Sequence, residues 1–93
     1  MEHIRVNIQE VSGSWKEKGF SCDIWIDPPG QAWENYVHNT DELFMVINGD
    51  MEIEINGKIF HPLPGEEIFI HRQSYHSVRN LGETTAQWLY GYN

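Results

Sequence analysis

The sequence predicts an all-β protein, a barrel or sandwich of many short strands, from two observations. Apolar residues recur with a period of two: Met51, Ile53 and Ile55 alternate with polar residues, as in a strand with one buried face. Turn-forming residues also interrupt the chain at short intervals, which is typical of such folds. They are Ser12-Gly13, Lys18-Gly19, Pro28-Pro29-Gly30, Asn48-Gly49-Asp50, Asn56-Gly57, Pro64-Gly65 and Leu81-Gly82-Glu83.

The segments near the two ends follow the same periodicity. Ile4, Val6 and Ile8 alternate with polar residues. One helical turn is conceivable around residues 11–18, but nothing longer has a period of 3.6 residues. Residues 87–90, with the sequence Gln-Trp-Leu-Tyr, predict a short aromatic strand.

Two dipeptides are strong signals for β-hairpins. They are Asn48-Gly49 and Asn56-Gly57. Asn and Gly tolerate the positive φ that both central positions of a type I′ turn require. We therefore expect a hairpin at each of these dipeptides.

Length and charge restrict the class of protein. With 93 residues, the chain is expected to be one domain, residues 1–93. A core this small needs good packing, closure into a barrel or a partner in a dimer, and twelve aromatic residues supply much of its apolar area. The net charge of −8 would repel phosphate backbones and anionic membranes, so we expect no nucleic-acid or membrane partner.

Cysteine usage and the N-terminal sequence predict a cytoplasmic protein. Cys22 is the single cysteine, so no intramolecular disulfide is possible and a reducing compartment is the simpler expectation. The first residues lack the pattern of a signal peptide, and no apolar run approaches the ~20 residues that span a bilayer.

Three residues are candidate metal ligands: His38, Glu42 and His76. His38 and Glu42 share one face of a continuous strand or, as we favour, face each other after a tight turn at residues 39–41. His76 belongs to a third strand that begins after residues 73–75. Burying these groups without partners costs several kcal/mol, and a divalent cation removes that cost.

These residues carry a resemblance to the cupin superfamily that covers residues 30–80. His38, Glu42 and Gly49 match the second histidine, the glutamate and the closing glycine of its first motif. His76 matches the histidine of its second motif, with Gly65 and Asn80 in register. The chain resembles the small single-domain cupin 2 type, which implies a double-stranded β-helix, or jelly-roll barrel.

The sequence departs from the cupin pattern at the first histidine of the His-x-His motif, where Tyr36 stands. His71 and Gln73 also replace the proline and glycine of the second motif. The ligand set that the resemblance implies is therefore two histidines and one carboxylate, which suits Fe(II), Mn(II) or Ni(II), with Zn(II) possible. Tyr36 is our candidate catalytic residue, as a proton donor to substrate; it is alternatively a distant fourth ligand or a space-filler.

Other residues have plainer interpretations. His61 and His71 are expected at the surface, the Glu52/Glu54 and Glu66/Glu67 pairs on solvated faces, and Cys22 as buried filler. A set of four aromatic residues either lines a pocket mouth or, as we favour for most of them, fills the core or a dimer interface. These are Trp25, Trp33, Trp88 and Tyr90.

Three functions compete. The first is a metal-dependent enzyme acting on a small organic molecule, such as an oxygenase, isomerase or decarboxylase-like enzyme. The second is a binding or sensing module for a sugar or organic acid, with or without metal. The third is a homodimeric structural protein with a vestigial pocket.

We expect a homodimer that pairs through edge strands. Its candidate contacts are Trp15, Trp88, Tyr90 and Tyr92.

Overall fold

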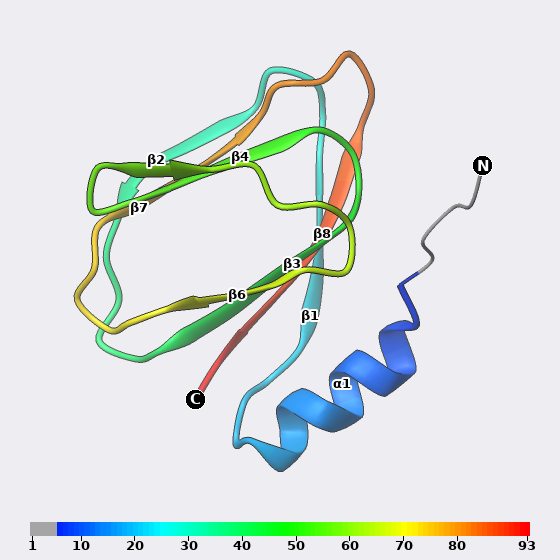
Figure 1. Ribbon diagram of the computed structural model, residues 1–93, viewed down its shortest axis with the longest axis vertical. Helices are drawn as coiled ribbons and strands as arrows, with labels where there is room; N and C mark the ends of the chain where they lie inside the picture. The colour runs from blue at the N-terminus through cyan, green and yellow to red at the C-terminus, as the bar shows by residue number, and fades with distance from the viewer. Residues whose placement is uncertain (1–5) are drawn as a thin grey trace.

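The computed structural model describes residues 6–93, in which one helix precedes eight strands (Figure 1). His3 and Ile4 lie outside these described residues. No helix within residues 6–93 is long and apolar enough to cross a membrane. The elements are α1 (Ile8–Glu17), β1 (Asp23–Asp27), β2 (Ala32–Tyr36), β3 (Glu42–Asn48), β4 (Met51–Ile55), β5 (Lys58–Phe60), β6 (Glu67–Ile70), β7 (His76–Asn80) and β8 (Ala86–Tyr92).

The strands form two antiparallel four-stranded sheets, which confirms the predicted all-β jelly-roll fold. The strand order is β1-β8-β3-β6 in one sheet and β2-β7-β4-β5 in the other. Consecutive strands therefore often belong to different sheets, as in a jelly roll. The C-terminal strand β8 lies inside its sheet, between β1 and β3.

The main hydrophobic core draws on both sheets. Met51 and Ile53 of β4 are buried, as their alternation with glutamates predicted. A second cluster surrounds Trp15 of α1, which is fully buried against Leu43, Met45 and Leu89. Strand β3 is thus buried on both faces, so residues 42–46 are all buried. The main core consists of Phe44, Val46, Met51, Ile53, Ile70, Val78, Ala86 and Trp88.

The expectation of no more than one helical turn was wrong. α1 has ten residues, and the Asn7 side chain caps it by accepting a hydrogen bond from the N–H of Glu10 (3.1 Å). Ile8 belongs to this helix and not to an alternating strand. Gly13 between two serines is a poor helix former, and packing of Trp15 outweighs that local preference.

One of the two hairpin predictions is confirmed and the other was wrong. Asn56 and Gly57 have φ of 49° and 84° and join the paired strands β4 and β5. Asn48-Gly49 instead connects β3 to β4, which lie in different sheets. Glycine is needed at position 49 because its φ is 110° and a Cβ would lie 2.5 Å from the Cβ of Ala86.

Candidate metal centre

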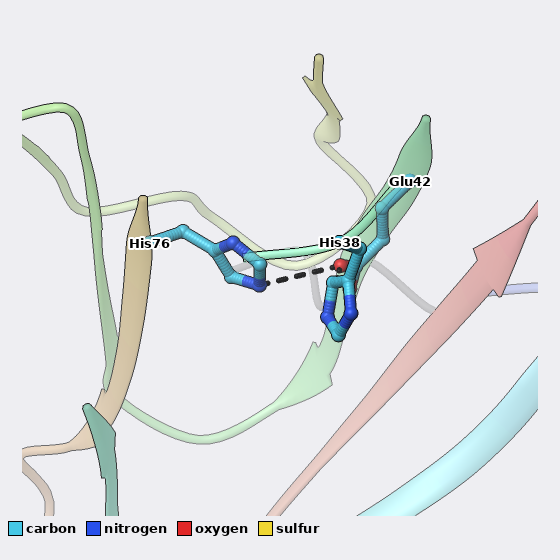
Figure 2. A group of neighbouring side chains, drawn as sticks. All are labelled: His38, Glu42 and His76. Atoms are coloured by element: carbon cyan, nitrogen blue, oxygen red, sulfur yellow. Dashed lines mark ion pairs between the residues drawn. The ribbon is translucent and has the colours of Figure 1, made fainter. Parts of the chain in front are cut away.

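The three predicted ligands come together from both sheets. Glu42 is the first residue of β3, His76 is the first residue of β7, and His38 lies on the link between β2 and β3. The chain does bend at residues 39–40, but β2 and β3 are not paired strands as we expected. The bend instead carries the chain from one sheet to the other, which brings His38 and Glu42 beside His76 (Figure 2).

The distances between the side chains are close to those around a shared ion. Oε1 of Glu42 lies 3.3 Å from Nε2 of His76 and 3.6 Å from Nε2 of His38. Ligand atoms about 2.1 Å from one metal ion are separated by roughly 3.0–3.4 Å in octahedral or tetrahedral geometry. One ligand atom from each residue lies within 4.8 Å of the others, so the group forms a possible metal site.

Oε1 of the Glu42 carboxylate lies within ion-pair distance of both histidines but has no hydrogen-bond partner in the described part of the chain. Among residues 6–93, its Oε1 is the only buried side-chain nitrogen or oxygen without a hydrogen-bond partner. Glu42 is only 4% exposed, and a carboxylate oxygen left unsatisfied at such a position is costly. A cation between Oε1 and the two imidazole nitrogens removes this cost, so the donor set fits a divalent metal.

His76 is oriented by its backbone surroundings. Its Nδ1 lies 3.4 Å from the carbonyl oxygen of Ser74, and a hydrogen on Nδ1 leaves Nε2 free to bind a metal. Burial by itself lowers the pKa of His76, but interaction with the Glu42 carboxylate and the Ser74 carbonyl outweighs it, so the pKa is raised. Proton and metal therefore compete for the same position between His76 and Glu42.

Tyr36 lines the cavity beside the two histidines. It is opposite His76 in the β2–β7 register, and its ring is nearly parallel to that of His38 at a centroid distance of 6.3 Å. A bulge in β2 produces this orientation, because three residue steps from Trp33 to Tyr36 span two steps on β7. Asn35 has φ of 56° there and donates its N–H to Oγ of Ser77 at 2.9 Å.

Tyr92 is a residue of this cluster that the sequence interpretation missed. Its hydroxyl lies 3.3 Å from Nε2 of His38. Burial, with smaller contributions from Glu42 and Tyr90, raises the pKa of Tyr92 to about 12, so the phenol stays neutral at physiological pH. The sequence contains a pattern that could have identified Tyr92. Trp88, Tyr90 and Tyr92 occupy every second residue of β8, which places them on one face of the strand.

A cavity of about 240 Å³ adjoins the candidate metal ligands. All four aromatic residues of that set line this cavity, and three of them also serve the core as expected: Trp88 belongs to the main core, and Trp33 and Tyr90 pack against it. Of the candidate dimer contacts, Trp15 of α1 is fully buried within the chain and cannot reach a partner, whereas Trp88, Tyr90 and Tyr92 line the cavity and stay predicted contacts. The lining residues are Trp25, Trp33, Tyr36, His38, Glu42, His76, Val78, Trp88, Tyr90 and Tyr92.

The remaining candidates lie away from the cavity. His61 and His71 are exposed, as predicted. Cys22 is half-buried, and burial raises the pKa of its thiol, which suits filler and not a nucleophile. The Glu52/Glu54 pair is not simply solvated, because both carboxylates accept hydrogen bonds from Arg79.

The fold and this site define a cupin. A family model described as a cupin domain, Cupin_2, matches residues 23–92. The chain therefore belongs to the cupin family, as the resemblance of its two motifs implied.

Two solved structures and one curated protein are similar to this chain. The plu4264 protein of Photorhabdus luminescens is 30% identical, with a TM-score of 0.72, over 78% of this chain and 61% of that one. An oxalate oxidase in complex with glycolate is 25% identical, with a TM-score of 0.71, over 82% of this chain and 42% of that one. A 5-nitrosalicylic acid 1,2-dioxygenase of Bradyrhizobium sp is 26% identical over 84% of this chain. This chain spans only 38% of the length of that dioxygenase.

Proposed function

We propose that this cupin binds one divalent transition-metal ion through His38, Glu42 and His76 and oxidises a small organic molecule in the adjoining cavity, with dioxygen as the oxidant. The observation that carries the proposal is the buried Oε1 of Glu42, which has no hydrogen-bond partner and faces Nε2 of both histidines. An ion at this point would satisfy the carboxylate and would be held by both imidazoles as neutral ligands.

The donor set narrows the choice of ion. Two imidazoles and one carboxylate suit Fe(II), Mn(II) or Ni(II), with Zn(II) possible. Three protein ligands leave coordination positions open, and the bound ion would act there as a Lewis acid or redox centre. Similarity to an oxalate oxidase and a nitrosalicylic acid dioxygenase supports an oxygenase or oxidase over an isomerase.

The other residues of the cavity have separate roles in this proposal. The Ser74 carbonyl orients His76, whereas the neutral Tyr92 phenol contacts Nε2 of His38, the atom that the ion would take. Tyr36 is the proposed proton donor to the bound molecule, because it lines the cavity beside His38 and His76. Its hydroxyl would hydrogen-bond an oxygen that gains negative charge during the reaction.

The alternative is a module that binds or senses a sugar or organic acid without turnover. The aromatic lining of the cavity supports binding whether or not chemistry follows. A homodimer, a cytoplasmic location, a single domain over residues 1–93 and the absence of a nucleic-acid partner also stay predictions. Light scattering of the purified chain tests the homodimer.

Metal analysis of the purified protein tests the proposal. We expect about one transition-metal ion per chain after loading with Fe(II), Mn(II), Ni(II) or Zn(II) and gel filtration. His76→Ala should lose the ion, whereas His71→Ala, which removes an exposed imidazole outside the cluster, should keep it. Negligible metal in all three proteins would overturn the proposal. Bound metal with ligand-induced stabilisation but no turnover of any organic acid tested would favour the binding module.

A further inference from the structure

Asp27 is a buried carboxylate that is surrounded by indole N–H groups. Its Oδ1 accepts hydrogen bonds from Nε1 of Trp25 (2.8 Å) and Trp33 (3.0 Å). Its Oδ2 accepts one from Nε1 of Trp88 (2.9 Å). Asp27 is only 1% exposed, so these three donors take the place of water around the charge.

The three indoles belong to both sheets and meet in the cavity wall. Trp25 and Trp88 lie on β1 and β8 of one sheet, and Trp33 lies on β2 of the other. The ring centroids of Trp25 and Trp33 are 5.6 Å apart with the planes at 80°. All three line the cavity, whereas Asp27 does not.

The backbone at Asp27 is also held in place. Nδ2 of the buried Asn80 side chain lies 3.3 Å from the carbonyl oxygen of Asp27 and 3.1 Å from that of Pro28, and donates to both. One carboxylate with a fixed main chain therefore bonds to three tryptophans at once.

We propose that Asp27 is a positioning residue, and that the three indoles it holds form a subsite for a planar aromatic ring. The inference deepens the proposed function: the ring would lie on the indoles while its oxygen substituent reaches the metal at His38, Glu42 and His76. Asp27 itself touches neither ligand nor metal.

The chemistry of the wall favours an aromatic ring. Because the indole N–H groups are already bonded to Asp27, the tryptophans offer a ligand mainly their carbon faces and edges. Aromatic rings pack against such surfaces in edge-to-face or offset arrangements. An apolar cavity of about 150 Å³ accepts benzene, so the cavity of about 240 Å³ has room for one substituted ring.

Charge argues against the other ligand class that aromatic walls bind, an organic cation. The proposed divalent ion would repel a cation in the same small cavity. Among the described residues, no Lys or Arg lines the cavity either, so an anionic group would be held by the metal and not by the wall. A neutral ring with an oxygen substituent therefore probes the wall by itself when it is added to protein without metal.

The test compares three probes: phenol, cyclohexanol and tetramethylammonium. Phenol and cyclohexanol each carry one hydroxyl on a six-carbon ring, and only phenol is aromatic. Because phenol is also the stronger acid and could bind a metal ion as phenolate, the preference is judged on protein without metal. We expect wild type to bind phenol roughly tenfold more tightly than cyclohexanol, as one or two aromatic contacts provide. Binding is followed by indole fluorescence with and without metal.

Asp27→Asn should abolish the preference for phenol, because an amide cannot accept hydrogen bonds at both positions. Its near-UV circular dichroism should also change, while its affinity for the metal is kept. Asp23→Asn removes an exposed carboxylate from the same strand and should behave as wild type. If Asp27→Asn does not fold, Trp33→Phe, which removes one donor and keeps an aromatic ring, should weaken the preference several-fold.

The outcomes separate this inference from the proposed function. The protein could show no affinity for metal and still prefer phenol in a way that depends on Asp27. This result would overturn the proposed metal chemistry and support the ring subsite. Equal binding of phenol and cyclohexanol, or tighter binding of tetramethylammonium, would overturn the ring subsite. An unchanged preference in Asp27→Asn, or in Trp33→Phe if that is the variant used, would overturn the positioning role.

Discussion

Oε1 of Glu42 and Nε2 of His76 lie 3.3 Å apart although Glu42 belongs to β3 of one sheet and His76 to β7 of the other. A metal ion held by both residues would therefore link the two sheets. Because unfolding separates the ligands, the free energy of metal binding adds to the free energy of folding.

We predict that metal raises the melting temperature. At a free metal concentration 100 times Kd, metal binding adds about 2.7 kcal/mol to the free energy of unfolding. For a domain of this size, 1 kcal/mol corresponds to roughly 4–8 °C. Differential scanning fluorimetry with Mn(II) should thus show an increase of about 10 °C or more. The increase should disappear with a chelator and be absent in His76→Ala; a similar increase in that variant would contradict binding at this site.

A second prediction separates the two tyrosines. The Tyr92 hydroxyl bonds Nε2 of His38, the atom that a metal would take. Tyr92→Phe removes this competitor, so its metal affinity should equal that of wild type or exceed it by up to about fivefold, as one hydrogen bond of about 1 kcal/mol allows. Tyr36→Phe should leave the affinity unchanged and lower turnover. Calorimetric titration measures the affinity, and a loss of it in Tyr92→Phe would make Tyr92 a ligand.

A third prediction concerns two glycines in different surroundings. A Cβ at Gly91 would overlap the carbonyl oxygen of Ser21 and lie 3.1 Å from the Trp15 ring. Gly91→Ala should therefore lower the free energy of unfolding by about 3 kcal/mol or more. Gly13 lies inside α1 and a Cβ there would meet no atom within 4 Å, so Gly13→Ala should raise stability by about 0.5–1 kcal/mol. Urea denaturation measures both, and equal effects would contradict the packing at Gly91.

A fourth prediction concerns acid stability. Arg79 donates to Glu34 (2.9 Å), Glu52 (2.8 Å) and Glu54 (2.9 Å), and its hydrogen bonds hold the pKa of Glu34 below the usual value. A lowered folded-state pKa stabilises the protein above the unfolded pKa of about 4.3, and this stabilisation is lost as pH falls through the folded value.

Denaturation of Arg79→Met as a function of pH tests this linkage. The variant should be less stable at pH 7, where three carboxylates repel one another, and should lose less stability on acidification than wild type. Lys58→Met serves as the control, because it removes a positive charge from the edge strand β5, which pairs with β4 and not with the strand β7 of Arg79. Parallel pH profiles for wild type and Arg79→Met would refute the role of the cluster.

The sequence predicted the features that short-range patterns determine. Alternation revealed β4, Asn56-Gly57 revealed its hairpin, and motif spacing brought His38, Glu42 and His76 into one group. Features that depend on where the chain crosses from one sheet to the other could not be predicted from such patterns. Asn48-Gly49 has the composition of a hairpin, yet both of its strands already have other partners.

The aromatic wall of the cavity, formed by Trp25, Trp33 and Trp88, could be predicted only by knowing which face of its strand each side chain occupies. The bulge at Asn35 shifts the alternation of β2, so Trp33 and Tyr36 share a face although they are three residues apart. Asp27 precedes Pro28-Pro29 and looks like a turn residue in the sequence. Its bond to Trp25 is local, its bond to Trp88 requires the pairing of β1 with β8, and its bond to Trp33 arises only when both sheets are assembled.

The second hydrophobic cluster under α1 has a consequence for solubility. The family model begins at residue 23, after α1, which ends at Glu17. A chain cut back to residues 23–92 would lose Trp15 and expose Leu43, Met45 and Leu89 on the outer face of a sheet. Such a chain would keep the candidate metal ligands and the aromatic wall but carry a new apolar patch, and we expect it to aggregate.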